Sequence, residues 1–245
     1  MDILLLRLEG TMMAFAGAFS GPDSDGPFGY PLPSALTGLI ANALGWSYLD
    51  GARHDRLQDR LRFVAGIEKP GALVADYQTA DLSRPHMLAT EKRPMWGSRT
   101  GRFAPVFRGG SSDAKTGTDV RTRSYWCGRS ILVAMTLDAA DESPTVPQVA
   151  RALLEPARPL FLGRTNCPPT APILAGGVEG DSLVDALTER LPPGAELFAA
   201  LPELGPRQSG DRVLVEPGRR AWTRYGAGVR HPDSQFYLVR RTAHA

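Results

Sequence analysis

The sequence has few of the residues that build metal centres, disulfide frameworks or membrane spans. Only two of its 245 residues are cysteine, Cys127 and Cys167, and four are histidine. Neither type recurs at ligand spacing, so we expect no structural zinc site and two reduced thiols. No run reaches the roughly 18 apolar residues of a transmembrane helix. The opening apolar run is short and meets Arg7, so we expect no signal peptide and a cytoplasmic location.

Motifs for catalysis are also lacking. The sequence contains no Walker phosphate loop and no nucleophile elbow, and Asp23 and Asp25 lie in a Gly/Pro-rich stretch without a ligand partner. We therefore expect a protein that is not an enzyme and that uses no metal or cofactor.

Positive charge is concentrated in two regions of the chain. Residues 84–129, which we call the arm, contain ten lysines and arginines against three carboxylates, and residues 207–241 contain eight arginines against three. The rest of the sequence has a formal charge of −10, although the whole chain is at only +2. Such local concentration indicates a specific groove for a polyanion rather than general adhesion.

Aromatic residues and glycines alternate with the charges of the arm. Guanidinium groups pair with phosphates, aromatic rings stack on unpaired bases, and glycine permits close approach of the backbone. The composition therefore favours binding of single-stranded RNA or DNA, while a solvated basic loop would have the same composition. The aromatic residues of the arm are Trp96, Phe103, Phe107, Tyr125 and Trp126.

The hydrophobic pattern predicts an α+β order of elements. Residues 3–8 form an apolar run typical of a strand, and apolar residues at helical spacing after Ser34 predict a helix that Ser34 caps and Gly45 ends. Pro70-Gly71 indicates a hairpin between two strands. The further predicted elements are strands at 62–69, 73–79, 131–137, 212–215 and 236–240, and helices at 146–154 and 182–191.

The order βαββ, insertion, βα is close to the split βαβ pattern of ferredoxin-like and RNA-recognition folds. We expect this core to span residues 1–175, with an insertion at about 80–124, because forty residues without periodicity are too long for an ordinary connection. Residues 176–245 are expected to form a small C-terminal extension.

Five segments, in order, resemble the CRISPR-associated Cas-five family, and within it the subunit of the type I-E Cascade complex. The most specific is Arg158–Pro168, which contains Leu-Gly-Arg followed by Cys-Pro. The others are Leu6–Phe15, Tyr30–Gly45, Asp76–Thr79 and Arg123–Cys127.

The resemblance implies an RNA-recognition-type core with a long thumb formed by the insertion. It implies binding of the 5′ handle of CRISPR RNA at the foot of a surveillance complex, where the guide RNA reads target DNA by base pairing. The implied protein partners are the repeated backbone-forming subunit and the large subunit that inspects target DNA. Another subunit would cut the precursor RNA.

Candidate RNA contacts follow from the charge pattern and the resemblance. Met13 and Phe15 stand where the family commonly has Gln and Trp, and are expected to form an apolar stacking platform. Tyr125 and Trp126 alternate across a strand, so one belongs to the core, and we expect Tyr125 to be the exposed one. The complete set is Arg7, Met13, Phe15, Lys92, Trp96, Arg102, Arg108, Arg121, Arg123, Tyr125 and Arg164.

Two other functions stay open at this point. A metal-independent endoribonuclease for precursor RNA would need a base and a proton donor, and His86 with Lys92 and Tyr77 has the required groups. A structural adaptor would use the arm to bind protein without RNA. Cleavage of repeat RNA in EDTA would indicate the endoribonuclease. Assembly with the backbone subunit in the absence of RNA would indicate the adaptor.

Overall fold

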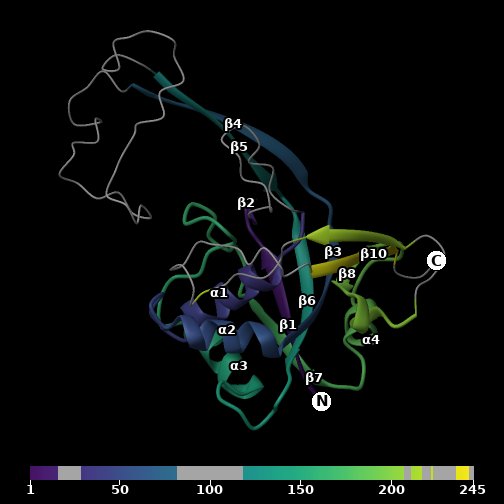
Figure 1. Cartoon of the computed structure of the whole chain (residues 1–245). Coiled ribbons are helices and arrows are strands. Elements are labelled where there is room, and N and C mark those ends of the chain that lie inside the picture. The colour runs from purple at the N-terminus through teal and green to yellow at the C-terminus, as the bar shows by residue number, and fades with distance from the viewer. Residues whose placement is uncertain (16–28, 82–117, 207–210, 217–221, 223–235, 243–245) are drawn as a thin grey trace.

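The computed structural model describes residues 1–15, 29–81, 118–206, 211–216, 222 and 236–242. These form a mixed α/β protein with two antiparallel sheets, one of seven strands in the order β7-β1-β6-β3-β8-β10-β9 and one of three in the order β2-β5-β4 (Figure 1). The strands are β1 (Asp2–Glu9), β2 (Met12–Met13), β3 (Leu61–Lys69), β4 (Ala72–Asp81), β5 (Thr118–Cys127), β6 (Ser130–Leu137), β7 (Leu174–Glu179), β8 (Glu196–Ala200), β9 (Arg212–Glu216) and β10 (Phe236–Thr242). The helices are α1 (Pro33–Ala43), α2 (Gly51–Arg60), α3 (Val146–Leu154), α4 (Leu183–Thr188) and the short 3-10 helix Leu201–Leu204.

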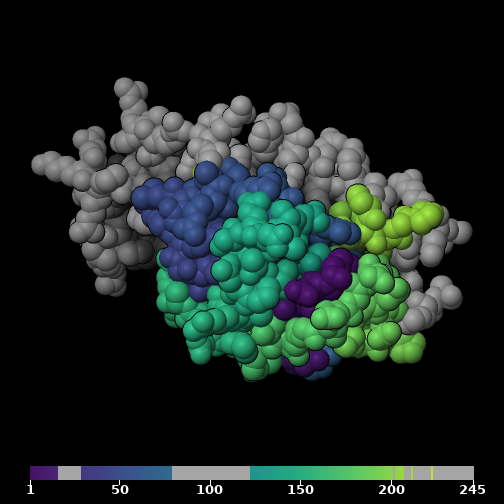
Figure 2. All heavy atoms as spheres, turned by 90° about the horizontal axis from the view of Figure 1, so that it is seen from below, coloured from purple at the N-terminus to yellow at the C-terminus, as the bar shows by residue number. Residues whose placement is uncertain are grey.

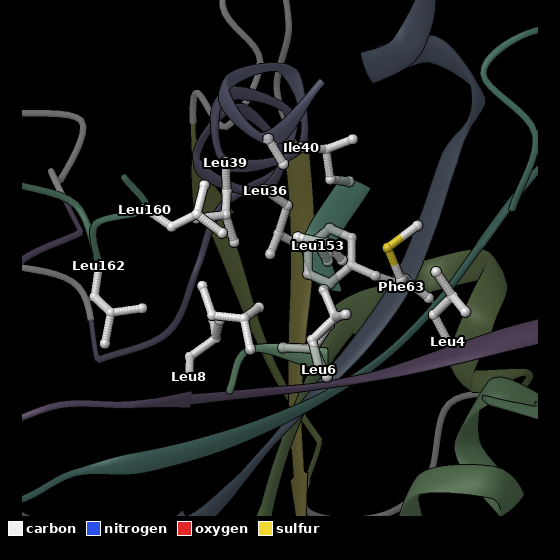
Figure 3. Close-up of a cluster of buried hydrophobic side chains, with 14 of the residues drawn as sticks. Leu4, Leu6, Leu8, Leu36, Leu39, Ile40, Phe63, Leu153, Leu160 and Leu162 are labelled. Atoms are coloured by element: carbon white, nitrogen blue, oxygen red, sulfur yellow. The ribbon is translucent and has the colours of Figure 1, made fainter. Parts of the chain in front are cut away.

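Alternation along β1 separates two hydrophobic cores on the two faces of the large sheet. Leu4, Leu6 and Leu8 point into a cluster with residues of α1 and α3 (Figure 3). Ile3 and Leu5 point to the opposite face and join the side chains of α4. Successive strand residues face opposite sides of a sheet, so β1 can line both cores.

The N-terminal strand is held between two later segments. β1 pairs antiparallel with β6 on one side and with β7 on the other. Seen from below, the N-terminal residues (purple) lie in a band between the teal segment that contains α3 and the green segment that contains β7 (Figure 2). Long-range strand pairing therefore fixes the position from which β2 and Phe15 continue.

β4 and β5 form a two-stranded ribbon that projects from the body (Figure 1). Their register runs without interruption from Ala72 opposite Cys127 to Asp81 opposite Thr118. The predicted hairpin at Pro70-Gly71 is therefore wrong. β3 pairs with β6 and β8 in the large sheet, and the chain passes into the other sheet at this turn.

Most predicted elements are confirmed within one to three residues at each end, but the cap of α1 is not. The helix begins at Pro33 after Leu32, and no side chain caps it. Proline fits there because the first helical N–H has no intrahelical partner. Gly45 follows the helix with a φ of 74°, which agrees with its predicted role as terminator.

The elements that were missed are α2, β7, β8, the two-residue strand β2 and the 3-10 helix Leu201–Leu204. The sequence of α2 is highly charged, and its buried face includes Arg60, which is 2% exposed. The Arg60 guanidinium donates to the carbonyls of Asp138, Ala139, Glu142 and Pro144. Arg60 therefore occupies a buried position of α2 where an amphipathic helix usually has an apolar residue. The apolar pattern that would have predicted this helix is absent for that reason.

The strands of the C-terminal part join the same sheet as the N-terminal strands. β7 pairs with β1, and β8 pairs with β3. In the part of the chain that is described, each helix is too short or too polar to span a bilayer.

Candidate nucleic-acid interface

A groove of about 600 Å³ lies where α1 meets the loop before β7. It contains two arginines, Arg158 and Arg164, and three aromatic side chains, Phe15, Phe161 and Trp222. The other lining residues are Ala14, Leu32, Ser34, Ala35, Gly38, Leu39, Asn42, Pro159, Gly163 and Thr165.

The Leu-Gly-Arg segment is shaped by contact with the chain that follows β2. Leu162 is fully buried, and its carbonyl accepts the amide of Ala14 at 3.0 Å. Gly163 has a φ of 98°, and a Cβ there would lie 2.1 Å from the Ala14 carbonyl oxygen. Only glycine meets both conditions, and the result is that Arg164 emerges into the groove.

The turn after Arg164 is closed by backbone hydrogen bonds. The amide of Leu162 donates to the carbonyl of Cys167 at 2.7 Å, and the amide of Cys167 donates to the carbonyl of Arg164 at 2.9 Å. Cys167 is buried, and burial raises the pKa of its thiol. The cysteine therefore packs as a neutral thiol beneath the groove rather than as a reactive thiolate.

Arg164 connects the groove to the ribbon. Its guanidinium lies 5.2 Å from the centroid of the Tyr125 ring, and the Tyr125 hydroxyl accepts the side-chain amide of Asn166 at 3.1 Å. Arg123 is two residues from Tyr125 on β5 and so shares its face of the strand. Its Nε is buried and has no hydrogen-bond partner among the described residues.

The opposite wall is α1 and the chain before Leu160. Asn42 donates to the carbonyl of Pro159 at 2.7 Å, and Arg158 donates to the carbonyl of Trp46. Ser34 and Ala35 belong to the uncapped first turn of α1 and line the groove. The partial positive charge at this helix end adds to that of the arginines.

Trp222 completes the groove from a distant part of the sequence. Its backbone amide donates to the Asp55 carboxylate at 2.9 Å, and its indole lies 4.5 Å from the His54 ring. The buried imidazole of His54 is also hydrogen-bonded through Nδ1 to the carbonyl of Asp50 at 2.9 Å. The last wall of the groove is therefore held on α2.

The groove is suited to an anionic ligand that carries unpaired aromatic bases. Two guanidinium groups and a helix N-terminus line it, and its described lining includes no carboxylate. In the same described ranges, no cluster of His, Cys, Asp or Glu has the geometry to hold a metal ion. The chemistry available is thus electrostatic and stacking interaction with a ligand such as single-stranded nucleic acid.

Phe15, Tyr125 and Arg164 are brought together beside the groove, but three of the predicted exposures are wrong. Met13 is fully buried and Phe15 is 4% exposed, so they pack in the core and do not form an open platform. Phe15 still contributes to the groove wall. Tyr125 is 2% exposed, whereas Trp126 is only half-buried, so Trp126 and not Tyr125 is the more exposed of the two.

Arg7 lies apart from the groove. It is on the face of β1 opposite to Leu6 and Leu8, as its position predicted, and forms a two-point ion pair with Glu68 at 3.1 and 3.2 Å. The carboxylate neutralises this arginine on the sheet surface. Lys92, Trp96, Arg102 and Arg108 lie outside the described residues, as does His86, and Arg121 is described only as a backbone position in β5.

Asn42, Ser34 and Trp222 were not predicted as parts of the groove. Asn42 and Ser34 occupy polar positions of a helix that look like ordinary surface residues. A lone tryptophan in an arginine-rich segment was the one available signal for Trp222, and it gave no indication of the surface that receives the ring. Arg158 belonged to the segment that carried the family resemblance.

Fold and groove together define a class: an antiparallel α/β protein with a cationic, aromatic-lined groove beside a projecting ribbon. The chain belongs to the CRISPR-associated protein (Cas_Cas5) family, whose model matches residues 3–236. This confirms the resemblance found in the sequence.

Individual relatives agree with this assignment. The CRISPR system Cascade subunit CasD of Escherichia coli (strain K12) is 26% identical over 198 residues, which is 80% of this chain and 80% of that protein. A chain of a solved CRISPR RNA-guided surveillance complex has 23% identity and a TM-score of 0.64, covering 98% of this chain and 88% of its own length. A crystal structure of a Cas protein has 20% identity and a TM-score of 0.55, with 99% and 95% covered.

Proposed function

We propose that this chain is the RNA-holding subunit of a Cascade-type CRISPR surveillance complex in antiviral defence. It clamps the 5′ handle of CRISPR RNA and caps the filament of the repeated backbone subunit. The large subunit that inspects target DNA is its other neighbour, so its link to DNA is indirect. It performs no chemical step in this proposal. Membership of the Cas_Cas5 family and the likeness to CasD support this proposal.

The groove is the observation that carries the proposal. It presents Arg158 and Arg164 without a competing carboxylate in its described lining, beside aromatic side chains from three parts of the chain. Phosphate contacts position a nucleic acid, and stacking holds unpaired bases. The ribbon, which carries Arg123 on the same face as Tyr125, leads from this groove into the basic residues of the arm.

The proposed architecture is a ferredoxin-like, RNA-recognition-type core with a thumb. β1, β6 and β3 lie side by side at the centre of the sheet, with α1 and α3 contributing to the core on one face. The β4–β5 ribbon would be the base of the thumb, and residues 82–117 its outer part. The division into a core of residues 1–175 and an extension of 176–245 remains part of the proposal.

The proposal is tested with the purified chain and labelled repeat RNA in EDTA, read on native and denaturing gels. We expect a shifted, intact RNA whose affinity falls steeply with salt concentration. Arg164→Ala and Arg123→Ala should each weaken binding by about 1–3 kcal/mol, because each would remove a charge-assisted hydrogen bond to phosphate. Arg108→Ala, in the arm, should have a similar effect.

Arg151→Ala is the matched control, because Arg151 is an exposed arginine of α3 outside the groove. Unchanged affinity in Arg164→Ala and Arg123→Ala, with a folded protein by circular dichroism, would exclude the groove as the RNA site. A discrete cut that is lost in His86→Ala would replace the proposal with the endoribonuclease alternative. Full assembly without RNA would favour the adaptor.

A further inference from the structure

The only two cysteines of the chain lie at the same hydrophobic cluster. Cys127 ends β5, and Cys167 lies in the loop before β7. Cys167 is a buried member of the cluster that β1 forms with α1 and α3, and Cys127 is a partly buried residue packed against it. Both are free thiols in the structure. The fold therefore brings together two thiols that are far apart in the sequence.

Cys127 lies on the face of β5 against which the loop of Cys167 packs. It is two residues from Tyr125 in a strand of regular register, so the two side chains share one face. On that face, the Tyr125 hydroxyl accepts the side-chain amide of Asn166 at 3.1 Å. Asn166 directly precedes Cys167 in the sequence. The strand therefore directs the thiol of Cys127 toward the segment that carries the second thiol.

The short strand β2 and the residue after it contact both segments. Met12 of β2 is paired with Cys127 of β5. Two residues further on, the amide of Ala14 donates to the carbonyl of Leu162 at 3.0 Å. The amide of Leu162 in turn donates to the carbonyl of Cys167 at 2.7 Å. Backbone contacts therefore connect the two cysteine segments through residues 12–14.

The two thiols differ in their access to solvent. Cys167 is fully buried, whereas Cys127 is partly exposed. Burial raises the pKa of the Cys167 thiol, and a negative charge on Cys127 raises it further. Because the interaction between two charges weakens with distance, this influence agrees with the short separation that the strand face and the backbone contacts indicate. A small oxidant therefore reaches Cys127 first, with Cys167 beside it in the protein interior.

We propose that Cys127 and Cys167 are an oxidation site, which hydrogen peroxide converts to an intrachain disulfide. The Cys127 sulfur attacks the peroxide, so that an S–O bond forms and the O–O bond breaks. The hydroxide that leaves takes up the Cys127 proton as water, and Cys127 becomes a sulfenic acid. The Cys167 sulfur then attacks the Cys127 sulfur, so that the S–S bond forms and the S–O bond breaks. The departing hydroxide takes the Cys167 proton as a second water, and a thiol reductant reverses the oxidation.

The disulfide acts on the turn that positions Arg164. A disulfide draws its two Cα atoms to within about 7 Å of each other. Cys127 is held by strand pairing on β5, whereas Cys167 lies in a loop, so it is the loop that moves. The amide of Cys167 donates to the carbonyl of Arg164, so the movement shifts Arg164 from its place beside Tyr125. Oxidation therefore weakens RNA binding in the groove, an effect that rests on the proposed function.

The test treats the dilute full-length chain with hydrogen peroxide, alkylates the remaining thiols and maps the peptides by mass spectrometry. We expect a disulfide between Cys127 and Cys167 that dithiothreitol removes. Cys127→Ser should form no disulfide. The matched control combines Cys127→Ser with Ser124→Cys, which restores a second thiol on the opposite face of β5 and should leave Cys167 reduced. Circular dichroism checks that both variants are folded.

The affinity for repeat RNA is then compared between the reduced and the disulfide-bonded chain. We expect oxidation to weaken binding by about fivefold or more, because a guanidinium–phosphate contact is lost, and to leave Cys127→Ser unaffected. Thiols that stay free, a disulfide between two chains, equal oxidation of the control, or unchanged affinity of the disulfide-bonded chain would each overturn the inference. A reduced wild-type chain that binds no RNA would instead contradict the proposed function. The peptide map is read without RNA, so the two failures are distinguishable.

Discussion

The body and the ribbon use strands for different purposes. All eight residues of β6 in the body are buried, whereas residues 72–78 of β4 in the ribbon are all exposed. β6 pairs with β1 on one side and with β3 on the other, and a hydrophobic core covers each of its faces. The side chains of β6 must therefore fit these two cores. In the ribbon, β4 pairs with β5, but the described side chains of β4 are not buried by other parts of the described chain. Its side chains are thus available for contacts outside the chain. Between residues 73 and 77 one face of β4 carries Leu73, Ala75 and Tyr77, which are uncharged, while Asp76 on the other face is opposite Arg123.

This contrast implies that stability and assembly are separable in this molecule. Substitutions in the body should change the free energy of unfolding, and substitutions in the ribbon should change what the chain binds. Three sets of variants test the separation, in order of decreasing effect.

The largest effect is expected from a matched pair of leucines. Leu6→Ala should lower the free energy of unfolding by about 2–5 kcal/mol, because Leu6 is fully buried between β1 and the helices and leaves a cavity. Leu73→Ala in the ribbon should change it by about 0.5 kcal/mol or less. Urea unfolding followed by circular dichroism measures both. Equal losses would show that the ribbon is part of the cooperative core and would break the comparison.

An intermediate effect is expected at the turn that places Arg164. Gly163→Ala should cost about 2–4 kcal/mol, because the φ of 98° is strained for alanine and the new Cβ collides with the Ala14 carbonyl. Gly194→Ala is the control. It shares a positive φ of 77° but has no atom within 4 Å of the place that a new Cβ would occupy, so only the backbone strain of about 1–2 kcal/mol applies.

The same two glycine variants also separate the fold from the groove. Gly163→Ala should weaken repeat-RNA binding at a temperature where it remains folded, because Ala14 and Arg164 must move apart. Gly194→Ala should leave RNA binding unchanged. Comparable RNA affinities in the two variants would show that the position of Arg164 is unimportant for binding.

The smallest effect is expected at an exposed ion pair on the body. Hydrogen bonding to Arg56 lowers the pKa of Glu142 below its ordinary value. This pair therefore stabilises the folded state above the pKa of Glu142 in the unfolded chain, and the contribution is lost as pH falls through the lower folded pKa. Glu142→Gln should lower the melting temperature slightly at about pH 7, and the difference should shrink as the pH falls through the lowered pKa of Glu142 in the folded chain. A difference that persists in acid would contradict this origin.

The sequence predicts the elements of the body well because their signals are local. Strand β1 and helices α1 and α3 each have an apolar pattern that a single packed face explains. The segment around Gly163 was recognised by its resemblance to the family's Leu-Gly-Arg and Cys-Pro pattern, and its contact with Ala14 gives the glycine a physical reason. These features depend on a few neighbouring residues or on one close approach.

The remaining features depend on contacts that no local pattern encodes. Alternation showed that Tyr125 and Trp126 lie on opposite faces, but the Asn166 and Arg164 contacts that bury Tyr125 come from another loop. The turn at Pro70-Gly71 indicated a hairpin, yet β4 pairs with β5 across the whole of residues 82–117. The burial of Arg60 replaced the apolar signal for α2.

The late position of Trp222 in the sequence determines when, during synthesis of the chain, the groove can be completed. Among the described residues, every other one that lines the groove lies between positions 14 and 165, so the ribosome makes Trp222 after all of them. A nascent chain can fold α1, α2 and the Leu-Gly-Arg turn and still lack one side of the groove. Docking of Trp222 on Asp55 and His54 then adds the last side of the groove. Truncated translation products would carry the basic arm without a closed groove, and would compete poorly with finished chains for RNA.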